Sequence, residues 1–203
     1  MKLGIFGGTF DPVHYGHLIL VECCRQELGL DSVRLVPAGQ PPHKTPDGMT
    51  DGHTRADMLN LAVSGCPDLV VDRREIRRTG KSYTVETLRE FKAEFPDDEL
   101  FFLMGADSIR DLLTWKDPEM ILDLATVVGV NRPGVAAPSI KQMSDWIGVS
   151  MASKIQIVQI PGCDLSATDL RRRVSEGRGL RFMTPKAVEA FIVECRLYLA
   201  ASK

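Results

Sequence analysis

Two histidines, His14 and His17, follow a short apolar run that ends in the glycine pair Gly7-Gly8. An imidazole N–H can donate to a phosphate oxygen, and a charge-assisted hydrogen bond of this kind contributes about 1.5–3 kcal/mol. The free backbone N–H groups and the dipole of a helix N-terminus also favour an anion. Because an amphipathic pattern begins at Leu18, the segment predicts a strand, a tight loop and a helix start that bind phosphate.

Other interpretations of these residues are open. The glycine pair could be only a tight strand-to-helix turn, and each histidine could be a surface residue, a helix cap or a metal ligand. Zinc takes three or four protein ligands, and no further Cys, His or carboxylate lies at a suitable spacing, so phosphate binding is favoured. The segment is neither GxGxxG nor the GxxxxGK[ST] of a Walker loop. No metal site built from protein side chains is expected.

Strand and helix patterns alternate along the chain. Strands are expected at 3–6, 33–37, 69–71, 100–104, 126–130 and 155–160. Helices are expected at 18–28, 54–63, 82–95, 118–124, 137–147, 166–175 and 185–199, the first of them closed by Gly29. Apolar strands separated by such helices predict an α/β fold, a Rossmann-like doubly wound parallel sheet with helices on both faces. Ligands bind such sheets at the carboxyl ends of the strands.

Bulk properties narrow the class of protein. The 203 residues are 44% hydrophobic and 26% charged, which is enough apolar material for a core that needs no disulfide bonds or metal. The length predicts a single domain over 1–203, with a C-terminal helical portion at 162–203. The net charge of −2 disfavours nonspecific nucleic-acid binding. No apolar run approaches the roughly 20 residues of a membrane span. Five cysteines without a CxxC pair are typical of reduced thiols in a cytoplasmic protein. A homo-oligomer is compatible with the sequence.

A second group of polar residues, Ser166, Thr168 and Arg171, opens a predicted helix. Ser166 is a natural N-cap. A cap does not explain Arg171, because the helix dipole disfavours a cation so near the N-terminus, whereas a bound phosphate would compensate. We therefore expect Arg171 to contact phosphate, and Arg172 and Arg173 to lie at the surface or at an interface.

The segment GGTFDPVHYGH at residues 7–17 resembles the T/HxGH signature of the nucleotidylyltransferase superfamily, and resembles the nicotinate-nucleotide adenylyltransferase family still more closely. Further segments resemble that family in the same order: PPHK at 41–44, SYTVETL at 82–88, GADS at 105–108 followed by Trp115, RPG at 132–134 and LSATDLR at 165–171. Two residues depart from the pattern. Ala167 stands where a second serine is common, and Lys116 stands where an aromatic or small polar residue also occurs.

The resemblance implies an enzyme of NAD biosynthesis that joins ATP and nicotinate mononucleotide (NaMN) to give deamido-NAD and pyrophosphate. The NaMN phosphate would attack the α-phosphate of ATP in line, and Mg²⁺ would be carried by the ATP phosphates. Such a reaction depends on positioning and charge neutralisation. The implied catalytic residues are His14, His17, Lys44 and Arg171. The implied ATP contacts are Gly7, Gly8, Thr9, Phe10, His14, His17, Gly105, Asp107, Ser166, Thr168 and Arg171. The implied NaMN contacts are Thr84, Val85, Trp115, Lys44, Arg55 and Arg132.

Several of these residues have a purely structural alternative. Asp107 could cap a helix or bind a ribose hydroxyl. Trp115 could pack in the core, the usual fate of tryptophan, or stack on the pyridine ring. The backbone N–H groups of Thr84 and Val85 could bind the nicotinate carboxylate or belong to a plain helix cap. Arg55 could form a surface ion pair with Asp51 or Glu22, and Lys44 could be a solvated lysine.

Two alternative functions are also compatible with parts of the sequence. One is a different adenylyl or cytidylyl transfer, such as that of phosphopantetheine adenylyltransferase, which shares the HxGH logic but not the other segments together. The other is a nucleotide-binding sensor that has lost turnover.

Overall fold

The computed structural model describes residues 1–41, 48–131 and 137–200. Six strands form one parallel sheet in the order β3-β2-β1-β4-β5-β6. They are β1 (Lys2–Gly8), β2 (Ser32–Pro37), β3 (Leu69–Val71), β4 (Glu99–Gly105), β5 (Thr126–Val130) and β6 (Ile155–Val158). The predicted Rossmann-like parallel sheet is confirmed. The predicted residues Lys44 and Arg132 lie outside the described residues.

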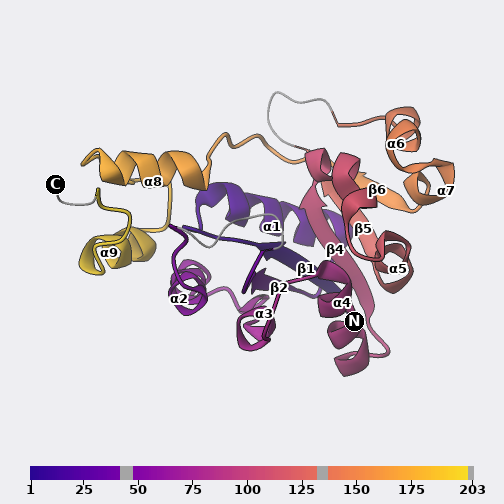
Figure 1. Cartoon of the computed structure of the whole chain (residues 1–203), viewed down its shortest axis with the longest axis horizontal. Coiled ribbons are helices and arrows are strands. Elements are labelled where there is room, and N and C mark those ends of the chain that lie inside the picture. The colour runs from indigo at the N-terminus through magenta and orange to yellow at the C-terminus, as the bar shows by residue number, and fades with distance from the viewer. Residues whose placement is uncertain (42–47, 132–136, 201–203) are drawn as a thin grey trace.

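The helices lie between and after the strands (Figure 1). They are α1 (Tyr15–Leu28), α2 (Gly52–Ala62), α3 (Arg74–Arg77), α4 (Thr84–Glu94), the 3₁₀ helix η1 (Ala106–Thr114), α5 (Pro118–Leu124), α6 (Ile140–Ile147), α7 (Val149–Ala152), α8 (Ala167–Ser175) and α9 (Lys186–Glu194). The short helices α3 and α7 were not predicted. Across the described ranges, no helix combines the length and apolar character that a bilayer crossing needs.

Five predicted helix boundaries are wrong by two residues or more. The helices expected at 18–28 and 54–63 begin earlier, at Tyr15 and Gly52. The helix expected at 137–147 begins only at Ile140, because Ser139 caps it. The helix expected at 82–95 begins at Thr84. The helix expected to run to residue 199 ends at Glu194, because Arg196 and Tyr198 adopt positive φ angles of 52° and 63°, which a right-handed helix cannot contain.

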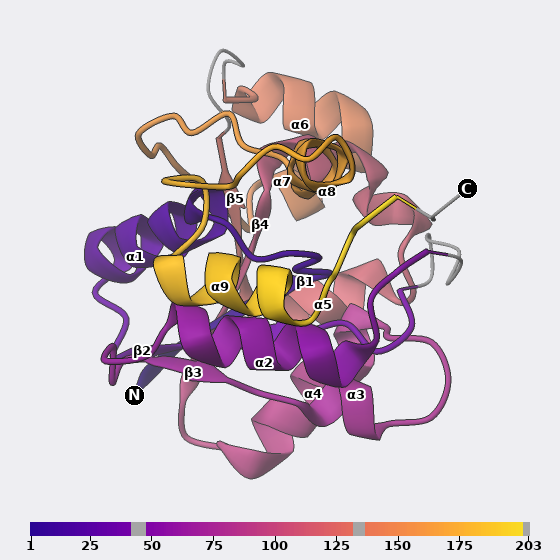
Figure 2. The ribbon, with the colours of Figure 1, turned by 90° about the vertical axis from the view of Figure 1, so that its left-hand side faces the viewer.

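The strands send alternate side chains to two separate cores. Leu100, Phe102 and Met104 of β4 pack with α4, η1, α5 and α6, whereas Phe101 and Leu103 pack with α1, α2, α8 and α9. Figure 2 shows α9 lying along α2 on the second face. Both faces of the sheet are therefore covered, as predicted.

The chain builds the sheet outward from β1 in one direction through β2 and β3, and then in the other direction through β4, β5 and β6. The switch point between these two halves lies between β1 and β4. In open parallel sheets the crevice at such a switch point, outside the carboxyl ends of the strands, is where ligands bind. β1 ends there at Gly7-Gly8 and β4 ends at Gly105. The fold thus brings two predicted segments to one edge of the sheet.

Candidate active site

The glycine pair that ends β1 has a different role at each position. Gly7 is exposed, and a Cβ atom built on it would have no heavy atom within 4 Å, so the backbone here is open to a ligand. A Cβ atom on Gly8 would lie 2.9 Å from the ring of Phe10. That ring is 1% exposed and packs edge-on against Phe6, with ring centroids 5.6 Å apart. Because the whole residue is buried, a contact between Phe10 and ATP would require neighbouring residues to move.

The two histidines lie against each other at the start of α1. Their rings stack with centroids 3.8 Å apart, and the backbone N–H of His14 donates to Nδ1 of His17 over 3.3 Å. The ring of Phe10 packs edge-on against His17, with centroids 5.0 Å apart. Because Nδ1 accepts a hydrogen bond, a neutral His17 carries its proton on Nε2 and can donate from that atom.

The two histidines differ in accessibility. His14 is the N-cap of α1 and is 5% exposed, whereas His17 is half-buried. His17 is therefore the histidine better placed to meet a phosphate. The phosphate contact expected of His14 stays a prediction.

Helix α8 meets the N-terminal motif, residues 7–17, through Arg171. One guanidinium nitrogen donates to the backbone oxygen of Asp11 over 2.6 Å, and the other lies 3.4 Å from the hydroxyl of Thr168. The hydroxyl of Ser166 accepts from the backbone N–H of Asp169 over 3.1 Å, so the predicted N-cap is confirmed. These contacts hold the N-terminal half of α8, with Arg171, beside the segment that carries both histidines.

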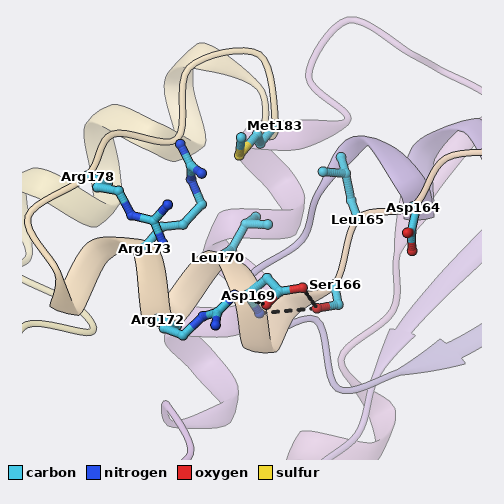
Figure 3. Close-up of a pocket in the computed structure, with 9 residues that line it drawn as sticks. All are labelled: Asp164, Leu165, Ser166, Asp169, Leu170, Arg172, Arg173, Arg178 and Met183. Atoms are coloured by element: carbon cyan, nitrogen blue, oxygen red, sulfur yellow. Dashed lines mark hydrogen bonds and ion pairs between the residues drawn. The ribbon is translucent and has the colours of Figure 1, made fainter.

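The opposite side of α8 borders a hollow of about 210 Å³ (Figure 3). Arg172 lies at the surface as expected and forms an ion pair with Asp169 over 2.7 Å. Neither His17 nor Arg171 lines this hollow, but Ser166, one of the predicted ATP contacts, does. Its lining residues are Asp164, Leu165, Ser166, Asp169, Leu170, Arg172, Arg173, Arg178 and Met183.

Arg55 corrects a sequence-based expectation. Its side chain is fully buried, so the alternative of a surface ion pair is wrong. The guanidinium donates to three backbone oxygens, those of Thr9 and Ala38 over 2.6 Å and that of Thr50 over 2.8 Å. Burial lowers the pKa of Arg55, and the nearby charge of Asp11 opposes that shift. Because the side chain is fully buried, the predicted contact with a substrate phosphate would require Arg55 or the residues around it to move.

Trp115 lies at the end of η1 and is half-buried. Its ring packs edge-on against Phe102, with centroids 6.1 Å apart. The neighbouring Lys116 lies over the ring of Tyr83, 4.7 Å from its centroid, and pairs with Glu86 in the first turn of α4. The structure thus brings the Trp115 segment and the start of α4, two predicted NaMN segments, side by side.

One capping alternative is wrong. Asp107 does not cap η1, because Gly105 is the N-cap and Asp107 lies exposed within the first turn. The start of α4 has Tyr83 as its N-cap, and no side chain makes a capping hydrogen bond there. The backbone N–H groups of Thr84 and Val85 are the first two of α4, which have no acceptor within the helix itself.

Comparison with known proteins gives the family. Residues 5–173 match the model of the cytidylyltransferase-like family. The chain belongs to the cytidylyltransferase-like family. A Thermus thermophilus protein described as "Probable nicotinate-nucleotide adenylyltransferase" is 42% identical over 200 residues, covering 98% of this chain and 100% of that one. A Moorella thermoacetica protein of the same description is 39% identical over 198 residues, covering 97% and 91%. The resemblance predicted from the sequence motifs is confirmed.

A solved structure shares the fold of this member of the cytidylyltransferase-like family. It is that of the Plasmodium falciparum nicotinic acid mononucleotide adenylyltransferase complexed with NaAD, with a TM-score of 0.76 and 97% of each chain covered. The sequence identity is 17%, so this likeness concerns the fold.

In this cytidylyltransferase-like chain, sequence reasoning missed a partly buried contact with the C-terminal segment. The hydroxyl of Tyr198 donates to one carboxylate oxygen of Asp11 over 2.6 Å, and the backbone N–H of Thr50 lies 3.3 Å from the other. Burial and the contact with Asp11 raise the pKa of Tyr198, so the phenol stays protonated and can donate. Thr184 also donates to the backbone oxygen of Val13 over 2.8 Å. Asp11 is part of the quoted motif, but no sequence signal marks Tyr198.

Within the part of the chain that the structure describes, no group of three or more His, Cys, Asp or Glu side chains is placed to hold a metal ion. His17 and Arg171, whose segments meet at Asp11, both carry donors that suit an anion.

Proposed function

We propose that this protein joins ATP and NaMN to form deamido-NAD and pyrophosphate, as an adenylyltransferase of NAD biosynthesis. The observation that carries the proposal is the hydrogen bond from Arg171 to the backbone of Asp11, which holds α8 against the histidine-bearing motif. Relatives described as nicotinate-nucleotide adenylyltransferases, about 40% identical over nearly the whole chain, support the choice of substrates.

The geometry suits direct displacement. The Nε2–H of His17 and the guanidinium of Arg171 bind the triphosphate and stabilise the negative charge that develops on the departing pyrophosphate. An oxygen of the NaMN phosphate forms the new bond to the α-phosphorus of ATP, and the bond from that phosphorus to the oxygen bridging to the β-phosphate breaks. The protein forms no covalent bond to the substrate. His14, Lys44, Ser166 and Thr168 assist on the ATP side.

Mg²⁺ fits this site as part of the bound nucleotide. Because the side chains found there are donors to anions, the ATP phosphates would hold the ion, which would supply further charge neutralisation when bound. Gly7, Gly8 and Thr9 would offer backbone to ATP, and the buried Phe10 would support them through its ring, which lies against Gly8. Gly105 and Asp107 would meet the ribose of ATP.

The NaMN side of the site is formed by α4 and the segment after η1. The carboxylate of the nicotinate ring accepts from the backbone N–H groups of Thr84 and Val85, which point out of the start of the helix. Trp115 stacks on the pyridine ring. Arg132 and Lys44 contact the NaMN phosphate.

The protein is proposed to work in the cytoplasm without a nucleic-acid or membrane partner. All five cysteines are free thiols, which suits a reducing compartment.

Pyrophosphate release from ATP tests the proposal directly. The full chain is offered ATP and Mg²⁺ with NaMN, nicotinamide mononucleotide (NMN) or phosphopantetheine in separate assays. Release with NaMN is expected. Release with phosphopantetheine alone would reassign the substrate, and tight ATP binding without release under any condition would favour a nucleotide sensor.

Replacing Trp115 with alanine is expected to raise the KM for NaMN about 2- to 10-fold, the loss of one aromatic stacking contact. Stacking acts equally on the ground and transition states, so kcat changes little. Trp146→Ala is the matched control, because Trp146 is also half-buried and packs against the same core. An effect of Trp115→Ala confined to the KM for ATP would assign this side chain to the other substrate.

A further inference from the structure

A group of buried polar side chains lies beneath the start of α4. Glu75 on α3 is 7% exposed, Ser82 is 8% exposed, and Thr87 on α4 is 3% exposed. Burial of a carboxylate is costly unless hydrogen bonds compensate, and it raises the pKa of Glu75. None of these three side chains has a part in the proposed transfer reaction, so their burial points to a different role.

The hydrogen bonds around Glu75 have a fixed direction. The hydroxyl of Thr87 donates to Oε1 of Glu75 over 2.6 Å, and the hydroxyl of Ser82 also bonds the same carboxylate. When the carboxylate is ionised it can only accept, and both hydroxyl protons then point toward it. The oxygen atoms of these hydroxyls are then left to accept from other donors, and Arg78 donates to that of Thr87 over 3.1 Å.

The oxygen of Ser82 accepts from the segment that follows β2. The backbone N–H groups of Gly39 and Gln40 lie 3.0 and 3.3 Å from it. The backbone N–H of Ser82 in turn donates to the oxygen of Gln40 over 2.9 Å. A Cβ atom on Gly39 would lie 2.2 Å from the backbone oxygen of Glu75, so only glycine allows this approach. Ser82 thus joins this segment to the residues that lead into α4.

The same segment is joined to the N-terminal motif. The backbone N–H of Ala38 donates to the oxygen of Gly8 over 2.9 Å. Arg55 donates to both Ala38 and Thr9. Hydrogen bonds at both ends of residues 38–40 therefore link the proposed ATP side, at Gly8 and Thr9, to Ser82 on the proposed NaMN side.

We propose that Glu75, Ser82 and Thr87 are positioning residues that fix the start of α4 relative to the N-terminal motif and so set the preference for NaMN over NMN. The inference rests on the proposed function, which places the nicotinate carboxylate at the Thr84 and Val85 amides. Two fixed N–H groups match the two oxygens of a carboxylate, whereas the amide of NMN presents one oxygen and one NH₂ donor. If the helix start shifts, both substrates lose contacts but the discrimination between them falls.

The test compares the ratio of kcat/KM for NaMN to that for NMN in the full chain. Ser82→Ala removes the acceptor for Gly39 and Gln40, and Thr87→Val removes one donor to Glu75 with little change in shape. Each is expected to lower the ratio about tenfold, within the range of losses that small displacements of reacting groups produce. Thr87→Ser keeps the hydroxyl and is expected to restore the ratio. The KM for ATP is expected to change by less than the ratio does.

Ser139→Ala supplies the matched control. The hydroxyl of Ser139 accepts from the backbone N–H of Gln142 over 3.2 Å and caps α6, so its loss lowers stability without touching the network. Its NaMN-to-NMN ratio is expected to equal that of the wild type. If Ser82→Ala does not fold, Thr87→Val and Thr87→Ser decide the matter.

The outcomes separate the inference from the proposed function. A wild-type ratio in folded Ser82→Ala and Thr87→Val, or an equal loss in Ser139→Ala, would overturn the positioning role while the wild-type preference for NaMN stands. A wild-type protein that turns over neither NaMN nor NMN would reject the proposed function and this inference with it.

Discussion

Replacing His17 with alanine is expected to lower kcat about 10²- to 10³-fold, as the loss of a preorganised donor to a developing charge does in other enzymes. The backbone N–H of His14 fixes the ring of His17 by donating to Nδ1, so the proton on Nε2 is already aimed when the substrate arrives. A donor aligned in advance acts most strongly on the transition state. We therefore expect the KM for NaMN to change far less than kcat.

Steady-state kinetics with NaMN and ATP, together with thermal melting, measure this effect. Melting is needed because the ring of His17 also packs against His14 and Phe10. His53→Ala is the matched control, since His53 lies exposed in the first turn of α2. Wild-type turnover by a folded His17→Ala protein would remove His17 from the mechanism.

The sheet could be predicted from the sequence because each strand is an apolar run between turn residues. The ranges 69–71, 118–124 and 126–130 coincide with β3, α5 and β5. Gly29 ends α1 at a positive φ of 61°, where glycine has no steric cost. These signals depend only on neighbouring residues, so they can be recognised without knowledge of the rest of the chain.

Other elements depend on contacts that no local pattern reveals. α3 and α7 are four residues long, too short to be stable without tertiary packing. The turns after α9 place Tyr198 against Asp11, residues 187 positions apart. Such a pairing has no sequence period, and only the folded chain shows it.

The site was predictable as a set of segments, but not in its internal supports. The motifs identified Arg171 and the histidines because their chemistry is unusual near a helix start. The partners of Arg55 are backbone oxygens, which every residue carries. The sequence could therefore mark Arg55 as a cation of interest without revealing that its side chain is buried.

Replacing Arg55 with methionine is expected to give the largest loss of stability among these variants. Three backbone oxygens would lose their donor, and each buried group left unsatisfied costs about 1–3 kcal/mol. The oxygens belong to the N-terminal motif, to the segment after β2 and to the segment before α2. We expect kcat/KM for both substrates to fall together with the melting temperature, and Arg77→Met, on the exposed side of α3, to leave both unchanged.

Arg55→Lys separates the charge of the side chain from its shape. Lysine keeps the positive charge, but its single ammonium group lacks the planar fork that reaches Thr9, Ala38 and Thr50 in three directions. If charge alone held the loop, lysine would restore activity. We expect it to recover part of the melting temperature and little of kcat/KM, because the N-terminal motif and residues 38–40 would no longer share one donor. Full activity of Arg55→Lys would mean that the N-terminal motif and residues 38–40 need only a positive charge at this position. The planar guanidinium would then not be what aligns the two halves of the site.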